Sequence, residues 1–450
     1  MKRAEFLRAV GMLAGSAVLG HGLTAAVLPV LSRIYSPGDF SVLAVFASLA
    51  SVLSVVAALR FDIAIPIPRE DADALSLLAL SVVLACAISS LLLVVALGWS
   101  PWIARQLGQS QLEPYLSLLP LAVLSACCYS ALQSWFVRDR GFSILARSRI
   151  AQSAASAGTQ VGLGYAAVAP LGLLVGYVVN TAMACLTLGG LLIHGRGREF
   201  RDAFSLSRMH GVFRDYSRFP KYSTLEAICN NGSVHLPIIM VAAIAAGPEA
   251  GYIALAMTLM QAPMSLVGSA IGQVYLSRAA EEHRAGRLPG LTTETISYLF
   301  KTGVGPLVAA GVIAPFVFEF VFGAGWERAG QLVAWMTPWF VLQFLAVPIA
   351  MSLHVTGHQR RALLLQVVGL LIRVGAVIIA ANLARDMVAE AYALSGAVFY
   401  FIYLQSVLVV TKVDRAHMMQ SLAVGMPHVM AWTIFAAASA VVLGLATGRP

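Results

Sequence analysis

The stretch Ala362–Leu383, ALLLQVVGLLIRVGAVIIAANL, is an apolar run with an arginine, Arg373, at its midpoint. A helix needs roughly 20 apolar residues to cross the hydrocarbon core of a bilayer. An arginine at the centre of such a helix costs at least ~2.5–3.5 kcal/mol, so we expect Arg373 to face a polar interior instead of lipid. The stretch therefore predicts a membrane-spanning helix that borders a hydrated, positively charged cavity.

The rest of the 450-residue chain repeats this composition. Hydrophobic residues make up 59% of it and charged residues only 11%, whereas about 25% of the residues in a soluble domain are charged. Apolar runs cover residues 10–31, 41–59, 74–99, 114–137, 147–166, 170–194, 222–246, 250–276, 294–322, 329–354, 362–383, 387–411 and 424–446. The composition therefore predicts an all-α integral membrane protein with 12, or at most 13, transmembrane helices.

Lysine and arginine are distributed unevenly among the loops between these runs. When the loops are assigned alternately to two sides, one side holds 23 basic residues and the other holds 5. Because basic residues accumulate in cytoplasmic loops, the N-terminus is expected in the cytoplasm. The net charge of +9 thus reflects orientation in the membrane and not nucleic-acid binding. The thirteenth run, 424–446, is either a further span or an interfacial helix.

One charged loop divides the chain into two halves. Every loop is short except residues 195–218, which separate six runs from six. An even number of spans per half keeps the halves in parallel orientation, an arrangement found in transporters built from repeats. We therefore predict six-helix bundles at 1–194 and 219–411, a cytoplasmic linker at 195–218 and an extra C-terminal helix within 412–450.

No sequence motif indicates an enzyme. The chain has no GxSxG elbow, P-loop, HExxH or Cys/His metal box, so we predict solute movement without a cofactor or metal. The first run follows three basic residues, as in a signal peptide, but it is too long and lacks a convincing cleavage site, so we interpret it as a retained span. The cysteines lie inside apolar runs without metal-ligand spacing and are interpreted as core residues; they are Cys86, Cys127, Cys128, Cys185 and Cys229.

Polar residues recur at helical spacing within several runs. Such stripes either join membrane helices through hydrogen bonds or line a solute pathway. The stripes are Tyr222, Glu226, Asn230 and Ser233 in the seventh run, Gln261, Ser265, Ser269 and Gln273 in the eighth, and Arg149, Ser153, Ser156 and Gln160 in the fifth. We interpret the serines of the fifth run mainly as packing residues.

Three segments resemble a known family. LPVLSRIYSPGDFSVLAVFASLASVLSVVAALRFDIAIPIPREDADA (Leu28–Ala74) is similar to the opening of Wzx-type polysaccharide flippases, which carry R-x-Y-S-P-x-(D/E)-F and R-(F/Y)-(D/E)-x-A-I motifs around their second helix. SRFPKYSTLEAICNNGSVHLPIIM (Ser217–Met240) and AGYIALAMTLMQAPMSLVGSAIGQVYLSRAAE (Ala250–Glu281) resemble the second half of the same family.

The resemblance implies membership of the multidrug/oligosaccharidyl-lipid/polysaccharide exporter superfamily. Its members have two six-helix bundles arranged as a V around a central cavity. The implied substrate is an undecaprenyl-diphosphate-linked oligosaccharide, which is flipped outward across the inner (cytoplasmic) membrane by alternating access. Such units feed the biosynthesis of O-antigen, capsule or exopolysaccharide, so a polysaccharide polymerase and a chain-length regulator are implied partners, besides membrane lipids.

From these expectations we assign candidate roles. The candidate substrate-binding residues are Arg373, Arg60, Asn230, Gln133, Gln261 and Lys301, where arginines attract the diphosphate and amides contact sugar hydroxyls. The candidate ion-coupling residues are Glu226, His235 and His21. Lys301 has the alternative of extending its ammonium group to the membrane interface, and each histidine that of a packing residue.

Two other functions remain open at this stage. A drug/cation antiporter of the same superfamily shares the fold but favours an acidic cavity, which the basic residues of the runs argue against. A membrane scaffold for glycan-assembly enzymes would instead depend on the 195–218 loop.

Overall fold

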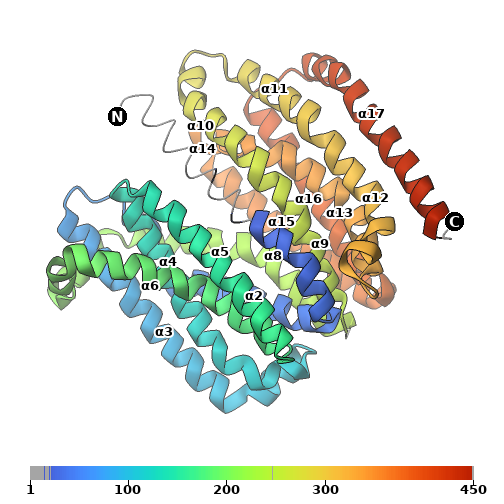
Figure 1. Cartoon of the computed structure of the whole chain (residues 1–450). Helices are drawn as coiled ribbons and strands as arrows, with labels where there is room; N and C mark the ends of the chain where they lie inside the picture. The colour runs from blue at the N-terminus through green and yellow to red at the C-terminus, as the bar shows by residue number, and fades with distance from the viewer. Residues whose placement is uncertain (1–14, 16–19, 21, 246, 448–450) are drawn as a thin grey trace. The chain divides into compact units, whose positions relative to one another are not determined.

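The computed structural model describes residues 15, 20, 22–245 and 247–447 (Figure 1). Regular structure in these residues is helical throughout, with no strand, which confirms the predicted all-α class. By their internal contacts the residues form two compact units, Met1–Gly251 and Tyr252–Pro450. Each unit is described by itself below.

Unit 1 contains α2 to α8 and the start of α9. Their bounds are α2 Pro37–Ala58, α3 Asp71–Gln106, α4 Leu119–Arg138, α5 Phe142–Tyr165, α6 Leu171–Asp202, α7 Leu206–Asp215, α8 Thr224–Ala245 and α9 Glu249–Pro263, with short turns η1 Asp62–Ala64, η2 Ser110–Leu118 and η3 Phe219–Ser223. A shorter apolar helix, Gly22–Ile34, precedes α2.

Unit 2 contains the rest of α9 and all later helices. Their bounds are α10 Ser269–Arg284, α11 Leu288–Leu299, α12 Gly305–Phe322, α13 Glu327–Ala346, α14 Ser352–Val355, α15 Gln359–Leu383, α16 Val388–Val410 and α17 Arg415–Thr447. Short turns interrupt them at η4 Met264–Gly268, η5 Phe300–Val304, η6 Val347–Ile349 and η7 Arg385–Met387.

Ten helical segments of the described residues are long and apolar enough to cross a membrane. They correspond to ten of the thirteen predicted runs. The fifth run forms α5 without reaching this apolar threshold, the eighth is broken into α9 and α10 by η4, and the first lies partly outside the described residues. A multi-pass helical architecture is thus confirmed, while the exact number of spans stays a prediction.

The family-like motif before the second helix acts as a helix start. The Ser36 hydroxyl accepts a hydrogen bond from the Asp39 amide at 3.2 Å, and the Asp39 carboxylate accepts one from the Ser36 amide at 2.8 Å. This reciprocal pair satisfies two amides that the first turn of α2 leaves unpaired. Pro37 occupies the first turn, where the absence of an N–H costs nothing. Tyr35 is buried and donates to the carbonyl of Gln160 at 2.7 Å, which ties the turn to α5.

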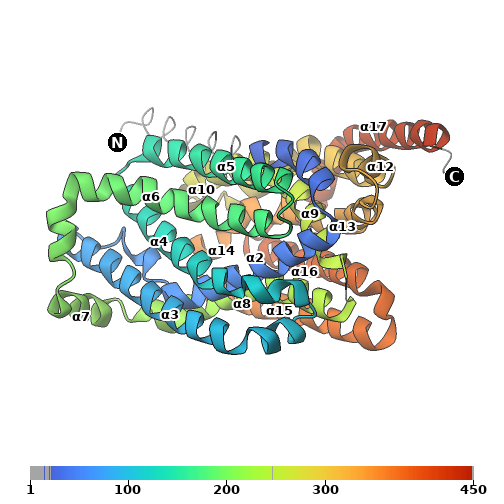
Figure 2. The same ribbon diagram turned by 60° about the horizontal axis from the view of Figure 1, so that its bottom comes forward.

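A large apolar core of unit 1 lies where η1 and α7 meet α3, α4 and α6. Phe61, Ala64 and Ile65 of the η1 region are fully buried in it, together with Met209 and Val212 of α7. Figure 2 shows α7 beyond the bend of α6, and α7 packs against α3. The amphipathic α7 therefore covers this end of the bundle with its apolar face.

The contact boundary between the units falls later than the predicted linker at 195–218. Helix α8 packs along α2 and so belongs to unit 1. The predicted bundles at 1–194 and 219–411, with the linker at 195–218 between them, stay a prediction.

The thirteenth run forms α17, a 33-residue helix that packs along α12 (Figure 1). Gly305 of α12 faces Trp432, and a Cβ there would lie 2.6 Å from the indole. Gly425 similarly faces Phe300 and Lys301. These close approaches need glycine, and they hold α17 against α12 and η5. The helix is long and apolar enough for a span, and its spanning of the membrane stays a prediction.

Candidate functional site

The polar residues of α8 take up two different environments. Glu226 is half-buried and Asn230 is exposed, whereas Ser233 is buried and donates to the Asn230 carbonyl at 2.8 Å. Nδ1 of His235 lies 3.2 Å from the hydroxyl of Ser48 on α2. His235 is thus held by a neighbouring helix, which fits both the packing and the ion-coupling interpretation.

A second cluster of polar residues in unit 1 lies at the turn after α2. Leu59 and Arg60 both have left-handed backbone conformations, with φ of 43° and 59°. The turn directs Asp62 into the bundle, where its carboxylate accepts a hydrogen bond of 2.5 Å from the Ser130 hydroxyl on α4. Gln133, one turn later on α4, is half-buried, as is Arg60. The sequence motif R-F-D contained Asp62, but spacing alone did not indicate its burial.

Sequence reasoning also missed an ion-pair cluster at the end of unit 1 that carries the predicted cytoplasmic loops. The Asp71 carboxylate pairs with Arg138 at 3.0 Å and with Arg196 at 2.6 Å. Arg138 also donates to the backbone carbonyl oxygens of Pro66, Pro68 and Arg69. The chain bends here, because Arg196 has a non-helical conformation inside α6. The cluster fixes the loop between α2 and α3 to the ends of α4 and α6.

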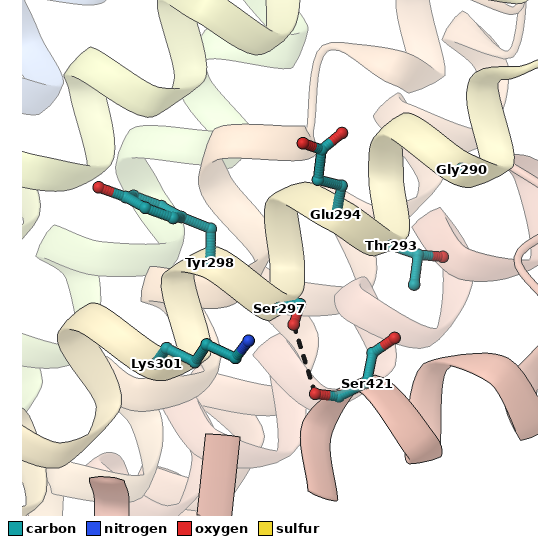
Figure 3. Close-up of a pocket in the computed structure, with 7 residues that line it drawn as sticks. All are labelled: Gly290, Thr293, Glu294, Ser297, Tyr298, Lys301 and Ser421. Atoms are coloured by element: carbon teal, nitrogen blue, oxygen red, sulfur yellow. Dashed lines mark hydrogen bonds between the residues drawn. The ribbon is translucent and has the colours of Figure 1, made fainter. Parts of the chain in front are cut away.

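A pocket of unit 2 lies between α11, η5 and α17. It encloses about 380 Å³ and is lined by Gly290, Thr293, Glu294, Ser297, Tyr298, Lys301 and Ser421 (Figure 3). The hydroxyl of Ser297 donates to the Ser421 carbonyl at 3.3 Å. In Figure 3 the Lys301 side chain extends toward this contact, while Glu294 points away from it.

The π-helical turn η5 sets the position of Lys301. Such turns are rare and occur often at functional sites, since they displace one side chain from the regular helical register. Lys301 is half-buried here. It therefore supplies a positive charge beside hydroxyl groups in a small pocket, an arrangement suited to an anionic group.

A second pocket shares two residues with the first. It encloses about 370 Å³ between α10 and α11, and Glu294 and Tyr298 belong to both pockets. Its other charged residue is Arg278. Helix α11 thus carries one carboxylate and one phenol between two cations, so this face offers contacts for both anionic and hydroxyl groups.

Arg373 lies in a different environment from the one predicted. Its side chain is 1% exposed, and its guanidinium carbon lies 4.8 Å from the ring centres of Trp339 and Phe399 and 5.6 Å from that of Tyr400. The prediction that Arg373 faces a hydrated cavity is therefore not met in this conformation. Aromatic faces attract a cation through their quadrupole, so protein rings replace the water that the sequence argument required.

The remaining predicted residues are placed as follows. Gln261 lies exposed near the end of α9, and His21 lies outside the described residues. Arg60, Gln133, Glu226, Asn230 and His235 belong to unit 1, whereas Gln261, Lys301 and Arg373 belong to unit 2. Within unit 2, Lys301 lies in the pocket between α11, η5 and α17, whereas Arg373 lies against the rings of Trp339 and Phe399.

The packing interpretation is confirmed for Ser156 of the fifth run. The buried Ser156 donates to the carbonyl of Gly176 on α6 at 2.8 Å, and Gln160 donates to that of Leu173 at 3.5 Å. Two cysteines likewise pack in the interior, since Cys127 donates to the Ser54 carbonyl and Cys185 to that of Ser125, whereas Cys86 is exposed and is not a core residue. These residues join helices and do not line either pocket.

Known proteins match between about half and nearly all of the chain. A family model described as "Polysaccharide biosynthesis protein" matches residues 30–331. The chain is similar to the amylovoran biosynthesis protein AmsL of Erwinia amylovora, with 24% identity over 250 residues, which are 54% of this chain and 62% of that protein. The alignment thus spans less than two thirds of the relative's length.

Solved structures share the fold. The lipid II flippase MurJ, in an inward closed conformation, matches with a TM-score of 0.71 at 12% identity, over 98% of this chain and 97% of MurJ. An inward-facing multidrug resistance MATE family transporter of the MOP superfamily matches with a TM-score of 0.59 at 14% identity, over 90% and 96% of the two chains. Likeness at such low identity establishes the transporter fold, which is a coarser conclusion than a shared substrate.

Proposed function

The chain belongs to the polysaccharide biosynthesis protein family, and from this membership we propose that it is a flippase for an undecaprenyl-diphosphate-linked oligosaccharide. The protein would move this repeat unit from the cytoplasmic to the outer leaflet by alternating access. The observation that carries the proposal is the combination of the family match with a flippase fold that extends over 98% of the chain. The similarity to AmsL, an amylovoran biosynthesis protein, supports the same class of product.

The residues of the pocket between α11, η5 and α17 suit the binding of an anionic headgroup. Lys301 offers a positive charge, and the hydroxyls of Thr293, Ser297 and Tyr298 lie in the same pocket. Hydrogen bonds from a cation to phosphate oxygens are roughly twice as strong as neutral ones. We infer that Lys301 contacts the diphosphate and that the hydroxyls contact either phosphate or sugar. Because the lipid tail stays in the bilayer, only the headgroup needs polar contacts.

The candidate residues of unit 1 are assigned further roles in this proposal. Exposed Asn230 and half-buried Gln133 present amides that suit sugar hydroxyls, and Arg60 adds a cation. Glu226 and His235 are proposed as sites of ion coupling, because both titratable side chains are neither fully buried nor fully exposed. We further propose that the N-terminus is cytoplasmic and that the protein resides in the inner membrane beside a polysaccharide polymerase and a chain-length regulator.

A flipping assay tests the proposal. Purified protein in proteoliposomes is given fluorescent undecaprenyl-diphosphate oligosaccharide, and flipped lipid is measured with a membrane-impermeant quencher. Lys301→Met is expected to lower the rate roughly 10- to 100-fold, the loss of one charge-assisted contact of about 1.5–3 kcal/mol. Lys412→Met, which changes an exposed loop lysine, is the matched control and should keep the wild-type rate.

The competing functions give different results in this assay. A drug/cation antiporter would transport cationic drugs and leave the lipid unmoved, and the fold likeness to MATE transporters makes drug transport the second measurement. A scaffold would show no transport, and its function in cells would depend on the 195–218 loop. Wild-type protein that moves drugs but no lipid-linked glycan would overturn the proposed substrate class.

A further inference from the structure

Helix α7 buries only part of its apolar face. Met209 and Val212 pack into the core of unit 1 and are 8% and 5% exposed. Leu206 and Phe213 share this face by their helical spacing, yet they are 82% and 41% exposed, and Phe204 just before the helix is 40% exposed. These three residues, Phe204, Leu206 and Phe213, form an apolar strip. An exposed apolar surface on a folded protein marks a contact with lipid or with another protein.

Basic side chains flank the apolar strip. From residue 198 to residue 221 the charged side chains are Arg198, Arg201, Arg208, Arg214, Arg218 and Lys221 against Glu199, Asp202 and Asp215, a net charge of +3 (six minus three). The six basic side chains are exposed, and none of them forms an ion pair within the described residues. Arg214 follows Leu206 by eight positions and therefore lies at the edge of the strip. The segment thus offers its positive charge to an anionic partner.

The length of α6 indicates where its chain leaves the membrane. The part of α6 without charged residues, 171–193, is about 34 Å long at 1.5 Å per residue. That length covers a hydrocarbon core of about 30 Å. The helix then bends at Arg196 and leads into α7 (Figure 2). The segment that follows Arg196 therefore lies outside the hydrocarbon core.

Charged contacts place α7 at the same depth as three helix ends. Asp71 at the start of α3 pairs with Arg138 at the end of α4 and with Arg196 at the bend of α6. Tyr216, the residue after α7, interacts electrostatically with Asp73 in the first turn of α3 and with Arg138. Helix α7 also packs against α3. The helix therefore lies at the membrane surface, at the depth of the lipid headgroups.

We propose that α7 binds the anionic phospholipids of the surrounding leaflet, with the apolar strip between headgroups and acyl chains and the flanking basic side chains on lipid phosphates. Helices with an apolar edge and basic polar residues bind at this boundary. The cytoplasmic leaflet, on which this end of unit 1 is predicted to lie, is the anionic one. Lipid suits the strip better than a protein partner, because lipid headgroups surround a membrane protein at this depth. This lipid contact is independent of the proposed flippase function.

A polarity-sensitive fluorophore tests the contact of the apolar strip. Leu206→Cys and Gly211→Cys are each labelled in a Cys86→Ala background, because Cys86 is exposed, and the background protein without a new cysteine gives the blank. Gly211 is the matched control, since it lies exposed on the polar face of the same helix and a Cβ there would have no atom within 4 Å.

Both labelled proteins are placed in nanodiscs of phosphatidylcholine and phosphatidylglycerol. The label at position 206 is expected to emit at shorter wavelength than in detergent-free water and to be quenched by lipids that carry bromine on their acyl chains. The label at position 211 should show neither effect. Equal emission and equal quenching at the two positions would overturn the proposal.

Lipid charge is tested with the label at position 206. Quenching should decrease when phosphatidylcholine replaces phosphatidylglycerol, and also at roughly 1 M salt, where the Debye length is about 3 Å. Arg214→Gln combined with Arg218→Gln should shift half-maximal quenching to a higher phosphatidylglycerol fraction. Arg284→Gln combined with Arg360→Gln changes two exposed arginines of unit 2 and should cause no shift. Quenching that ignores lipid charge would contradict the binding of anionic lipid.

Trypsin tests the same contact in the unmodified full-length chain. Cleavage after Arg208 and Arg214 should be about 5- to 30-fold slower in nanodiscs with phosphatidylglycerol than in phosphatidylcholine alone, the effect of one or two basic residues at an anionic surface. Cleavage after Arg284, in the exposed connection between α10 and α11, reports any effect of lipid on the protease. Equal rates at Arg208 in every lipid mixture, relative to Arg284, would overturn the proposal and leave a protein partner as the occupant of the strip.

Discussion

Replacement of Arg373 separates a structural role from a substrate-binding role. Arg373→Ala removes three cation–π contacts, with the guanidinium 4.8, 4.8 and 5.6 Å from the ring centres. Each is worth about 0.5–2 kcal/mol, and truncation of a large buried side chain to alanine costs about 2–5 kcal/mol. Because these terms overlap, we expect a loss of roughly 3–5 kcal/mol of stability. One kcal/mol corresponds to about 2–4 °C in a unit of some 200 residues, so Tm should fall by about 6–20 °C.

Arg373→Met is the informative partner variant. Methionine keeps most of the side-chain volume and makes favourable contacts with aromatic rings. Replacement of a buried charge by an apolar side chain of similar size is often neutral, so Tm should stay within a few degrees of the wild type. Both variants are measured by thermal denaturation in detergent, followed by size-exclusion chromatography with fluorescence detection.

Two results would refute the reasoning. A wild-type Tm for Arg373→Ala would show that the aromatic cage contributes little to the fold. An unchanged Tm for Arg373→Met combined with loss of flipping would show that the guanidinium contacts substrate in another conformation. The sequence-based assignment of Arg373 to substrate binding would then hold. The protein would have two conformations, one with Arg373 enclosed by aromatic rings and one with Arg373 in contact with substrate.

Further predictions concern stability and use the same thermal assay. Gly396→Ala should cost about 1–3 kcal/mol through overpacking, because a Cβ there would lie 2.2 Å from the indole of Trp339, which also contacts Arg373. Gly375→Ala is the control, since a Cβ there would have no atom within 4 Å. Equal losses of stability in the two variants would contradict the packing account. Arg138→Ala should cost about 1–3 kcal/mol, because it leaves backbone carbonyls without their donor and removes one of the two cations that pair with Asp71; the cost should exceed that of Arg198→Ala, which changes a neighbouring exposed arginine. Ser36→Ala should cost about 0.5–2 kcal/mol through loss of the N-cap, and no change in Tm would argue against the capping role.

Composition and periodicity predicted the helical architecture, because a helix buried in lipid has an easily recognised apolar composition. A membrane helix must be apolar over its whole span and must satisfy its own backbone hydrogen bonds. The apolar runs therefore predicted most of the helices, among them α2, which corresponds to the run 41–59. The same local logic predicted that Ser156 joins two helices. Each of these inferences depends on neighbours within a few residues along the chain.

The sequence by itself thus determined the membrane-spanning helical class, the family resemblance and the packing role of Ser156. Only the tertiary structure decided what surrounds each ionisable group. Arg373 was expected in water and lies among aromatic rings contributed by α13 and α16, while Asp62 passed unnoticed in a loop motif and lies buried beside α4. The reason is physical: the free energy of a charge depends on atoms within a few ångströms, and in a folded chain those atoms come from residues distant in sequence.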